Sequence, residues 1–315
     1  MTTHIAVDIG GTRMRAATYR PDSLTPIKIE RIKTRKKGST PQERLEKLIA
    51  SVWPEDDEVA AIGIAVPGPV NCTTQTIEKA PNVPELSGLP ISQMLQERFS
   101  VPTYLGNDAN LAALGEWKFG AGRGHHYMIY LTISTGIGSG VIIDDKIFSG
   151  ARGFAAELGH TMALPDGPIC GCGVRGHLET VASGTAIAKW VAGEISNGAT
   201  SSIEYDPNSD ELISGAVIAE AAKAGDELAL QAFKRAGTYL GWAIADFLHI
   251  FNPTIIVLGG GVSQSYELFS AELYTAIEAR LMAPNFLDEL EIVIAELGDD
   301  VGLMGALALA RESTC

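Results

Sequence analysis

The chain has 315 residues, of which 46% are hydrophobic and 20% are charged, and its formal net charge is -14. The length allows one large or two medium domains, and the composition is that of an ordinary soluble globular protein. The acidic balance, with no cluster of Lys and Arg beyond residues 31–37, argues against a nucleic-acid partner. Without a signal peptide, or an apolar run near the roughly 20 residues of a membrane span, we expect a cytoplasmic protein.

The first part of the chain predicts an α/β unit. Residues 5–9 are a short apolar run that predicts a buried strand, two glycines turn the chain, and residues 14–19 return as a second strand. A helix is expected from Pro41 to Val52, where apolar residues recur at three- and four-residue steps. The elements expected next are a buried strand at 59–66, a short helix at 91–99, a strand at 103–105 and a helix at 107–119.

The opening pattern occurs a second time further along the chain. Residues 128–134 predict a strand, residues 135–140 a glycine-rich turn, and residues 141–144 the returning strand. A supersecondary unit that repeats in this way suggests duplicated halves. The remaining expectations are a surface loop at 196–214, a long helix from 226 to about 252, a buried strand at 255–258, a strand at 290–295 and a closing helix at 302–310.

Three glycine-rich turns are candidates for binding a nucleotide. In the first, Asp8 precedes Gly10, Gly11 and Thr12, whose N–H groups and hydroxyl suit a polyphosphate, with Asp8 placed to orient a hydrated Mg²⁺. A plain hairpin turn with an Asx contact is the alternative. The second turn, residues 134–140, matches neither common phosphate-loop pattern, and the third, residues 259–261, follows a buried strand. They could admit phosphates and the face of an adenine or ribose, or be ordinary turns.

Asn107 and Asp108 stand at an expected strand-to-helix junction. Either side chain could cap the helix. The functional alternative is an amide and a carboxylate that hold neighbouring sugar hydroxyls, with the carboxylate accepting a proton as a hydroxyl attacks a phosphoryl group.

Four residues between positions 160 and 177 have the types and spacing of metal ligands. They are His160, Cys170, Cys172 and His177, and four such ligands close a tetrahedral, structural Zn²⁺ site. The alternative is a pair of reduced cysteines and two unrelated histidines. The same segment carries Glu157 and Glu179, so a bound metal could also shape a neighbouring site.

In their order along the chain, these motifs resemble the ROK family of sugar kinases and sugar-responsive repressors, and within it the bacterial glucokinases. The resemblance covers nearly the whole chain. It implies an α/β fold, the actin-like (ribonuclease H-like) duplicated two-domain fold with a central cleft. Residues 1–119 would form a small domain and 120–301 a large one with a zinc-binding segment at 157–179. A hinge would lie near Gly120, and a last helix at about 302–315 would return to the first domain. The motifs that carry the resemblance to the ROK family are Asp8–Thr12, Pro67–Pro69, Pro81–Asn82, Gly106–Asn110, Thr135–Gly138, Glu157–His160, Cys170–Gly173 and Asn252–Gly261.

The resemblance also implies roles for single residues. Asp108 would be the catalytic base, Asn107, Glu157, His160 and Glu179 would grip the sugar, and Gly68 and Asn82 would line the same pocket. Gly11, Thr12, Thr135 and Gly136 would bind phosphates, and Gly260 and Gly261 adenosine. One position departs from the family pattern, which has a third cysteine where this chain has His177. Because imidazole is a competent zinc ligand, we predict a site of two histidines and two cysteines.

The predicted function is ATP-dependent phosphorylation of a hexose, glucose first, in carbohydrate metabolism and glycolysis, by a homodimer or higher oligomer. N-acetylmannosamine, N-acetylglucosamine and fructose are the alternative substrates. A DNA-binding regulator is disfavoured because only seven residues precede Asp8. A non-catalytic sugar sensor is expected to lack the base or a phosphate loop, and both are present. An actin-like ATPase would not explain the presence of the candidate sugar-binding residues.

Overall fold

The structure is a computed structural model that describes residues 2–207 and 212–312. The chain divides into two compact units. The first unit comprises residues 2–130, 140–156 and 295–312, and the second comprises residues 131–139 and 157–294. The division falls within two adjacent strands, β8 (Tyr127–Ile133) and β9 (Ile137–Ile143).

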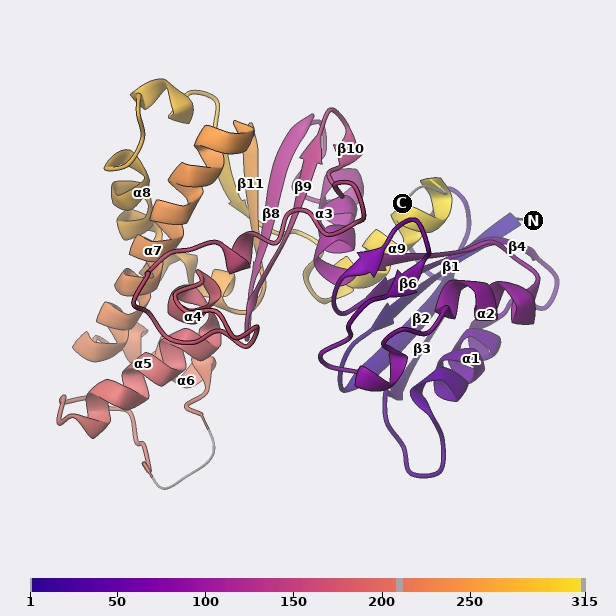
Figure 1. The fold of residues 1–315 in the computed structure, drawn as a ribbon, viewed down its shortest axis with the longest axis horizontal. Coiled ribbons are helices and arrows are strands. Elements are labelled where there is room, and N and C mark those ends of the chain that lie inside the picture. The colour runs from indigo at the N-terminus through magenta and orange to yellow at the C-terminus, as the bar shows by residue number, and fades with distance from the viewer. Residues whose placement is uncertain (1, 208–211, 313–315) are drawn as a thin grey trace. The chain divides into compact units, whose positions relative to one another are not determined.

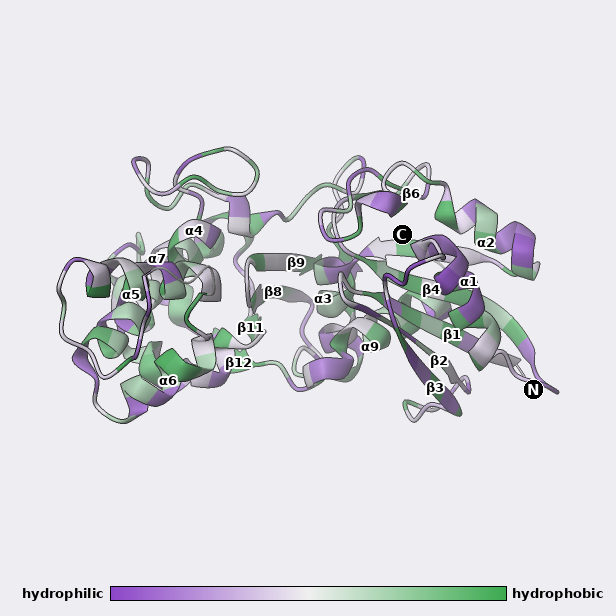
Figure 2. Cartoon of the chain, turned by 90° about the horizontal axis from the view of Figure 1, so that it is seen from below, coloured by the Kyte–Doolittle hydropathy of each residue, from purple (hydrophilic) through white to green (hydrophobic). Residues whose placement is uncertain are grey.

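The first unit is built on a five-stranded sheet of order β3-β2-β1-β4-β7. The strands β1 (Thr2–Ile9) and β2 (Arg13–Tyr19) form the expected antiparallel hairpin. β4 (Glu58–Val66) pairs in parallel with β1, and β7 (Thr103–Asn107) in parallel with β4. β3 (Lys28–Lys33) is an exposed edge strand next to β2, and it is hydrophilic in Figure 2, in contrast to the apolar β1 and β4. A small separate sheet joins β5 (Val70–Asn71) and β6 (Thr76–Ile77).

Helices cover both faces of this sheet (Figure 1). On one face lie α1 (Pro41–Val52) and α2 (Ile91–Phe99), whose apolar residues share a core with β1 and β4. On the other face lie α3 (Asp108–Phe119) and α9 (Val301–Glu312). The result is a three-layer α/β/α arrangement, which explains why the central strands are buried on both sides.

The second sheet has the order β10-β9-β8-β11-β12, which repeats the pattern of the first. It begins with antiparallel strands and ends with a parallel pair, β11 (Ile255–Gly259) and β12 (Glu291–Ile294). This shared order confirms the duplicated halves. The remaining elements are β10 (Lys146–Ile147), α4 (Glu179–Ala182), α5 (Gly184–Ser196), α6 (Gly215–Lys223), α7 (Glu227–Phe251) and α8 (Ser270–Glu278), with short 3-10 turns at Pro84–Leu86, Leu158–His160, Val262–Leu268, Pro284–Leu287 and Gly298–Asp300.

One expectation about the second half needs correction. The glycine-rich stretch is not one turn from 135 to 140, because β9 already begins at Ile137. A Cβ atom at Gly140 would lie 2.6 Å from Ala113 Cβ, so this glycine makes room for α3 and not for a phosphate. The expected loop at 196–214 is confirmed for its described residues, because α5 ends at Ser196 and α6 begins at Gly215. Residues 208–211 lie outside the described residues, and the two flanking helices were not predicted.

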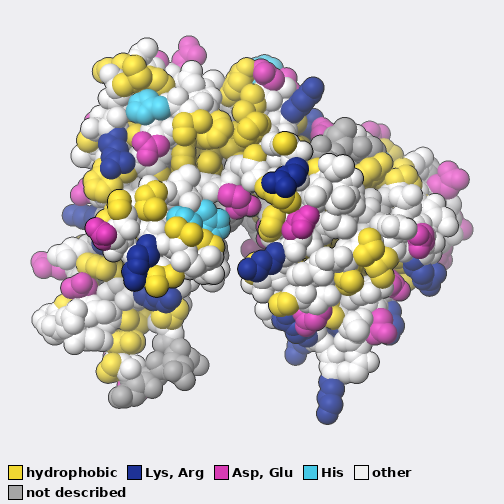
Figure 3. Space-filling view, viewed as in Figure 1, with side chains coloured by type: hydrophobic (Ala, Val, Ile, Leu, Met, Phe, Trp, Pro, Cys, Tyr) yellow, Lys and Arg dark blue, Asp and Glu magenta, His cyan; other side chains and the backbone are white. Residues whose placement is uncertain are grey.

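Charged side chains are spread over the surface. The basic run 31–37 lies on the edge strand β3 and the loop after it, where Arg35 forms an exposed ion pair with Glu85. Figure 3 shows Lys and Arg scattered among Asp and Glu over the visible face. Across residues 2–207 and 212–312, no helix has both the length and the apolar character to span a membrane.

A fully buried carboxylate joins the end of α3 to the segment before α9. Glu116 is 0% exposed and accepts hydrogen bonds from the N–H groups of Ala121 (2.9 Å), Leu297 (2.9 Å) and Glu296 (3.2 Å). The Glu116 carboxylate satisfies three buried backbone N–H groups. A side chain that could not accept these hydrogen bonds would leave buried donors unpaired and destabilise the fold.

Glu116→Gln is therefore expected to lower the free energy of unfolding by roughly 2–3 kcal/mol, because the new amide N–H₂ would face backbone N–H groups. Urea denaturation measures the change. Glu97→Gln is the matched control, since Glu97 is exposed on α2. Equal losses in the two variants would contradict the role given to Glu116.

Candidate functional site

In the first unit, the turn between β1 and β2 is held from two sides. Gly10 N–H donates to Arg13 O (2.9 Å), and the Thr34 hydroxyl donates to Gly10 O (2.6 Å). A Cβ atom at Gly11 would lie 2.9 Å from Asn82 Cβ, so the turn packs against this predicted sugar-site residue. Thr12 is exposed at the tip. The backbone of the turn is thus held in a fixed position, with the Thr12 side chain at its tip.

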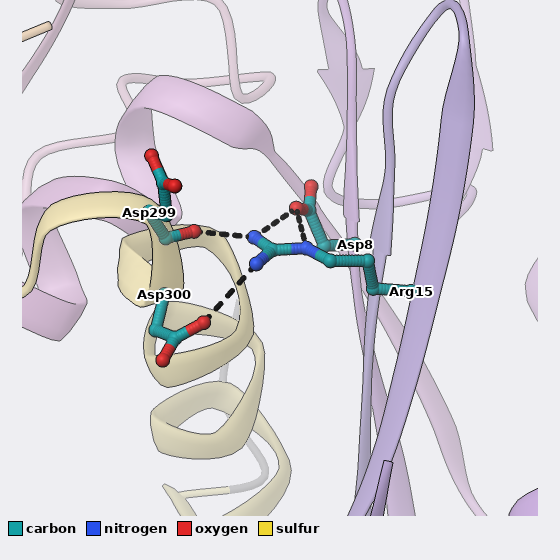
Figure 4. A network of polar contacts seen from close by, with 4 residues as sticks. All are labelled: Asp8, Arg15, Asp299 and Asp300. Carbon is teal, nitrogen blue, oxygen red and sulfur yellow. Dashed lines mark hydrogen bonds and ion pairs between the residues drawn. The ribbon is translucent and has the colours of Figure 1, made fainter. Parts of the chain in front are cut away.

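Asp8, just before this turn, is engaged by an arginine that the sequence analysis did not single out (Figure 4). Asp8 and Arg15 lie directly opposite each other in the β1–β2 pair. Asp8 Oδ2 is 2.7 Å from Arg15 Nη2 and 3.2 Å from Arg15 Nε. A Cβ atom at Gly302, in the first turn of α9, would lie 2.8 Å from Asp8 Cγ, so the carboxylate also lies close to that helix N-terminus.

Asn107 is the N-cap of α3, as the capping alternative predicted. Its Oδ1 accepts hydrogen bonds from the N–H groups of Ala109 (3.0 Å) and Asn110 (3.1 Å). Its Nδ2 donates to Gly68 O (3.0 Å) and to Asp108 Oδ1 (3.2 Å). Ala109 N–H also donates to Asp108 Oδ1 (2.9 Å). Asn107 therefore caps the helix and also fixes the Asp108 carboxylate, so the two alternatives from the sequence do not exclude each other.

Gly68 is held against the loop that follows β6. Its φ is +96°, and a Cβ atom there would lie 2.0 Å from Lys79 O. Only glycine fits a position with both constraints. The structure thus brings Gly68, Asn107 and Asp108 together at the carboxyl ends of β4 and β7.

In the second unit, the phosphate-loop candidate contacts a predicted sugar ligand. Glu179 Oε2 accepts a hydrogen bond from Ile137 N–H (3.1 Å), and a Cβ atom at Gly136 would lie 2.2 Å from the same oxygen. Gly136 therefore lets the carboxylate of Glu179 approach the loop. Two residues whose predicted roles differ, one for phosphate and one for sugar, are in direct contact.

The turn Leu158–His160 packs against the start of β9. Leu158 N–H donates to the buried Ser139 Oγ (2.9 Å), and a Cβ atom at Gly159 would lie 2.0 Å from Ile137 O. These contacts fix Glu157 and His160 at the two ends of the turn. Partial burial raises the pKa of Glu157 above its usual value; His160 opposes this change and Glu179 adds to it.

A cavity of about 570 Å³ opens beside the phosphate-loop candidate, at Ser134 and Thr135, in the second unit. Its lining is mainly apolar and includes Thr135 and Gly261 from the predicted nucleotide turns. The N-terminus of α5 contributes Gly184 and Thr185, which sequence reasoning missed. The N-cap Ser183 before a run of small and apolar residues was the available signal. A flat heterocycle fits such a cavity. At the α5 terminus, Gly184 N–H already donates to Ser134 O (2.7 Å) and Ala186 N–H to Ser183 Oγ (3.1 Å).

Gly260 fixes the third glycine turn. Its φ is +83°, and a Cβ atom there would lie 2.4 Å from Ile133 O. Gly260→Ala is expected to lower the free energy of unfolding by about 2 kcal/mol or more, since backbone strain and a backbone clash combine. Gly261→Ala is the control, because nothing lies within 4 Å of its added Cβ. Thermal unfolding of the two variants measures the difference, and similar midpoints would count against this role for Gly260.

The four predicted metal ligands form one cluster, with all donor atoms within 4.8 Å of one another. His160 Nδ1 is 3.2 Å from His177 Nδ1 and 3.5 Å from Cys170 Sγ, and Cys172 Sγ is 3.3 Å from His177 Nδ1. Three segments of the chain, 158–160, 170–172 and 177, converge here, so the two histidines lie beside the two cysteines. The cluster, His160, Cys170, Cys172 and His177, has the ligand types of a metal site.

Comparison with known proteins identifies the family. The ROK family matches residues 4–313. The chain belongs to the ROK family. A glucokinase of Thermotoga maritima is 34% identical to this ROK protein over 98% of the chain and 97% of the relative. An N-acetylmannosamine kinase of Escherichia fergusonii is 31% identical over 99% of both chains. The crystal structure of a ROK family glucokinase from Streptomyces griseus, in complex with glucose and AMPPNP, is 33% identical and superposes with a TM-score of 0.80, covering 98% of this chain and 99% of that chain.

The ROK fold is the actin-like duplicated α/β fold, as the motifs predicted. The predicted site residues separate into two groups, one in each unit. The first unit holds Asp8, Gly10, Gly11, Thr12, Gly68, Asn82, Asn107 and Asp108, and the second holds Thr135, Gly136, Glu157, His160, Cys170, Cys172, His177, Glu179, Gly260 and Gly261.

Proposed function

We propose that this ROK protein is an ATP-dependent glucokinase that converts glucose to glucose 6-phosphate. The observation that carries the proposal is the Asp108 carboxylate, fixed at the first residue of α3 by donors from Asn107 and Ala109. The similarity to glucokinases over nearly the full chain supports the same reaction. A cytoplasmic, homodimeric state is a further prediction.

In the proposed reaction, the 6-hydroxyl of glucose attacks the γ-phosphorus of ATP. A new O–P bond forms, the bond to the β,γ-bridging oxygen breaks, and ADP leaves. Asp108 accepts the hydroxyl proton as the attack proceeds and later returns it to solvent. The N–H groups of the turns at Gly11 and Gly136 donate to phosphate oxygens. Magnesium bound with the nucleotide supplies neutralisation of the phosphate charge.

The proposed sugar contacts divide by their side-chain chemistry. Asn107 uses both amide hydrogens inside the protein, so its main contribution is to orient Asp108 and Gly68. Glu157, with its raised pKa, and the exposed His160 are suited to sugar hydroxyls. Glu179 would act both on the sugar and on the backbone of the phosphate loop.

We propose that the metal cluster binds one structural zinc ion. A tetrahedral zinc site has donor-to-donor edges of about 3.3 Å between nitrogens and about 3.6 Å between nitrogen and sulfur, from usual zinc bond lengths. Three of the six separations, 3.2, 3.3 and 3.5 Å, fit these edges, and all six lie within 4.8 Å. Nδ1 of His160 faces the cluster, so its Nε2 would carry the proton and could donate to a sugar hydroxyl.

The deciding experiment is ADP release with Mg-ATP across glucose, mannose, fructose, N-acetylglucosamine and N-acetylmannosamine. Glucose is expected to give the highest kcat/KM. Turnover only with an N-acetylated sugar would keep the reaction and replace the substrate, in line with the N-acetylmannosamine kinase relative. A folded, zinc-loaded protein that releases no ADP with any sugar would contradict the kinase and favour a sensor.

A further inference from the structure

Arg15 makes more contacts than an ordinary cross-strand ion pair needs. Besides its two contacts with Asp8 Oδ2, it donates from Nη2 to Asp299 O (2.5 Å) and from Nη1 to Asp300 Oδ1 (3.1 Å). Figure 4 shows the guanidinium between Asp8 and the turn that precedes α9. The side chain of Arg15 is only 14% exposed, against 60% for Asp300. A guanidinium fixed on both sides in this way has one orientation.

The contacts with Asp8 are one-sided. Both Nε and Nη2 of Arg15 reach the same oxygen, Oδ2. Within the part of the chain that the structure describes, no hydrogen bond reaches Oδ1. Arginine commonly binds both oxygens of a carboxylate at once, so the arrangement leaves Oδ1 available where a bidentate pair would occupy it.

The charges of the network keep Asp8 attractive to a cation. An arginine beside a single carboxylate would cancel its charge and weaken its attraction for Mg²⁺. Here the second carboxylate, Asp300, offsets the guanidinium, and the three groups together carry one negative charge. A carboxylate oxygen is also the ligand type that Mg²⁺ or its bound water prefers.

We infer that Arg15 is a positioning residue for Asp8: it holds Oδ2 so that Oδ1 faces the magnesium ion that accompanies the nucleotide. This inference rests on the proposed function, in which the turn after Asp8 binds phosphate. A merely structural role, tying β2 to the turn before α9, would require the contacts with Asp299 and Asp300 but not the two contacts with one oxygen of Asp8.

The test is a double-mutant cycle on nucleotide binding. Calorimetry gives the Kd of AMPPNP, in Mg²⁺ and in EDTA, for the wild type, Arg15→Ala, Asp8→Asn and the double variant. The ratio of the two Kd values is the affinity gained from the metal. Arg15→Ala is expected to reduce this gain by about tenfold. In the Asp8→Asn background, the same Arg15→Ala substitution should cause no further reduction, because the effects of residues that act through one another are not additive.

Two further variants keep the test decisive. Arg15→Lys keeps the charge but has one amine, which cannot span Asp8 and the Asp299 carbonyl, so a loss of about threefold is expected even if Arg15→Ala does not fold. Arg123→Ala removes another arginine of the first unit, from an exposed ion pair with Glu296, and should leave the metal gain unchanged.

The outcomes separate this inference from the proposed function. An equal loss of affinity in Mg²⁺ and in EDTA for Arg15→Ala, or an undiminished effect in the Asp8→Asn background, would overturn the positioning role. A metal gain in Arg15→Lys equal to that of the wild type would do the same. If the wild type binds Mg-AMPPNP but phosphorylates no sugar, the proposed glucokinase function is contradicted, while the double-mutant cycle on nucleotide binding still tests the role of Arg15. A wild type that binds no nucleotide would overturn both.

Discussion

Replacing Asp108 with asparagine is expected to lower kcat for glucose by roughly 10²- to 10⁴-fold, which is the usual contribution of a general base. The amide oxygen can still accept the hydrogen bonds that Ala109 N–H and Asn107 Nδ2 give to Asp108 Oδ1. The fold of the junction and the Kd for glucose should therefore stay near their wild-type values. Steady-state kinetics and calorimetric glucose binding measure the two effects.

Asp145→Asn is the matched control for this substitution. Asp145 is an exposed carboxylate of the first unit, paired with His126, and its φ of 65° is one that asparagine tolerates. It should keep the wild-type kcat. If Asp108→Asn retained most of its turnover, or lost glucose binding in proportion to kcat, Asp108 would not be the base.

Replacing His177 with alanine is expected to remove the zinc and to lower the midpoint of thermal unfolding by about 10 °C or more, because a structural zinc stabilises the folded state by many kcal/mol. His177 is buried, with its Nδ1 between the Nδ1 of His160 and the Sγ of Cys172. Activity should fall as a consequence, since His160 loses its fixed orientation. Metal analysis and calorimetric scanning provide the measurements.

His177→Cys and His125→Ala complete the zinc experiment. The cysteine variant restores the three-cysteine pattern of the family and should keep about one zinc per chain. His125 belongs to the first unit, outside the metal cluster, and its loss should leave the zinc content unchanged. A His177→Ala protein with unchanged zinc would exclude His177 as a ligand.

Local patterns were sufficient to predict most elements of the first unit. The helix Pro41–Val52 begins and ends where its apolar spacing indicated, with Thr40 and Glu43 forming a capping box. The Asn107–Asp108 junction was predicted both as a cap and as a candidate site, because the residue types suit both roles. In the second half, the glycines after Ile137 were misassigned to a turn because a strand glycine and a turn glycine look alike without their neighbours.

The part of the site that sequence reasoning missed depends on contacts between distant segments. Arg15 and Asp300 are 285 positions apart, and Glu179 and Ile137 are 42 apart. No local period or spacing records such pairs. The metal cluster was the exception, because its four ligands lie within one short segment and their chemical types are distinctive.

The place of α9 in the first unit has a consequence for biosynthesis. Leu303 and Leu307 of this helix pack over Ala6 of β1 and Ala65 of β4, which are among the earliest residues to leave the ribosome. That face of the sheet is covered only in part, by α3, until residues 301–312 have been translated. The nascent chain must therefore carry an exposed apolar surface through most of its synthesis, when chaperones are most useful. Premature termination before residue 301 would yield a product prone to aggregation and proteolysis rather than a smaller functional domain.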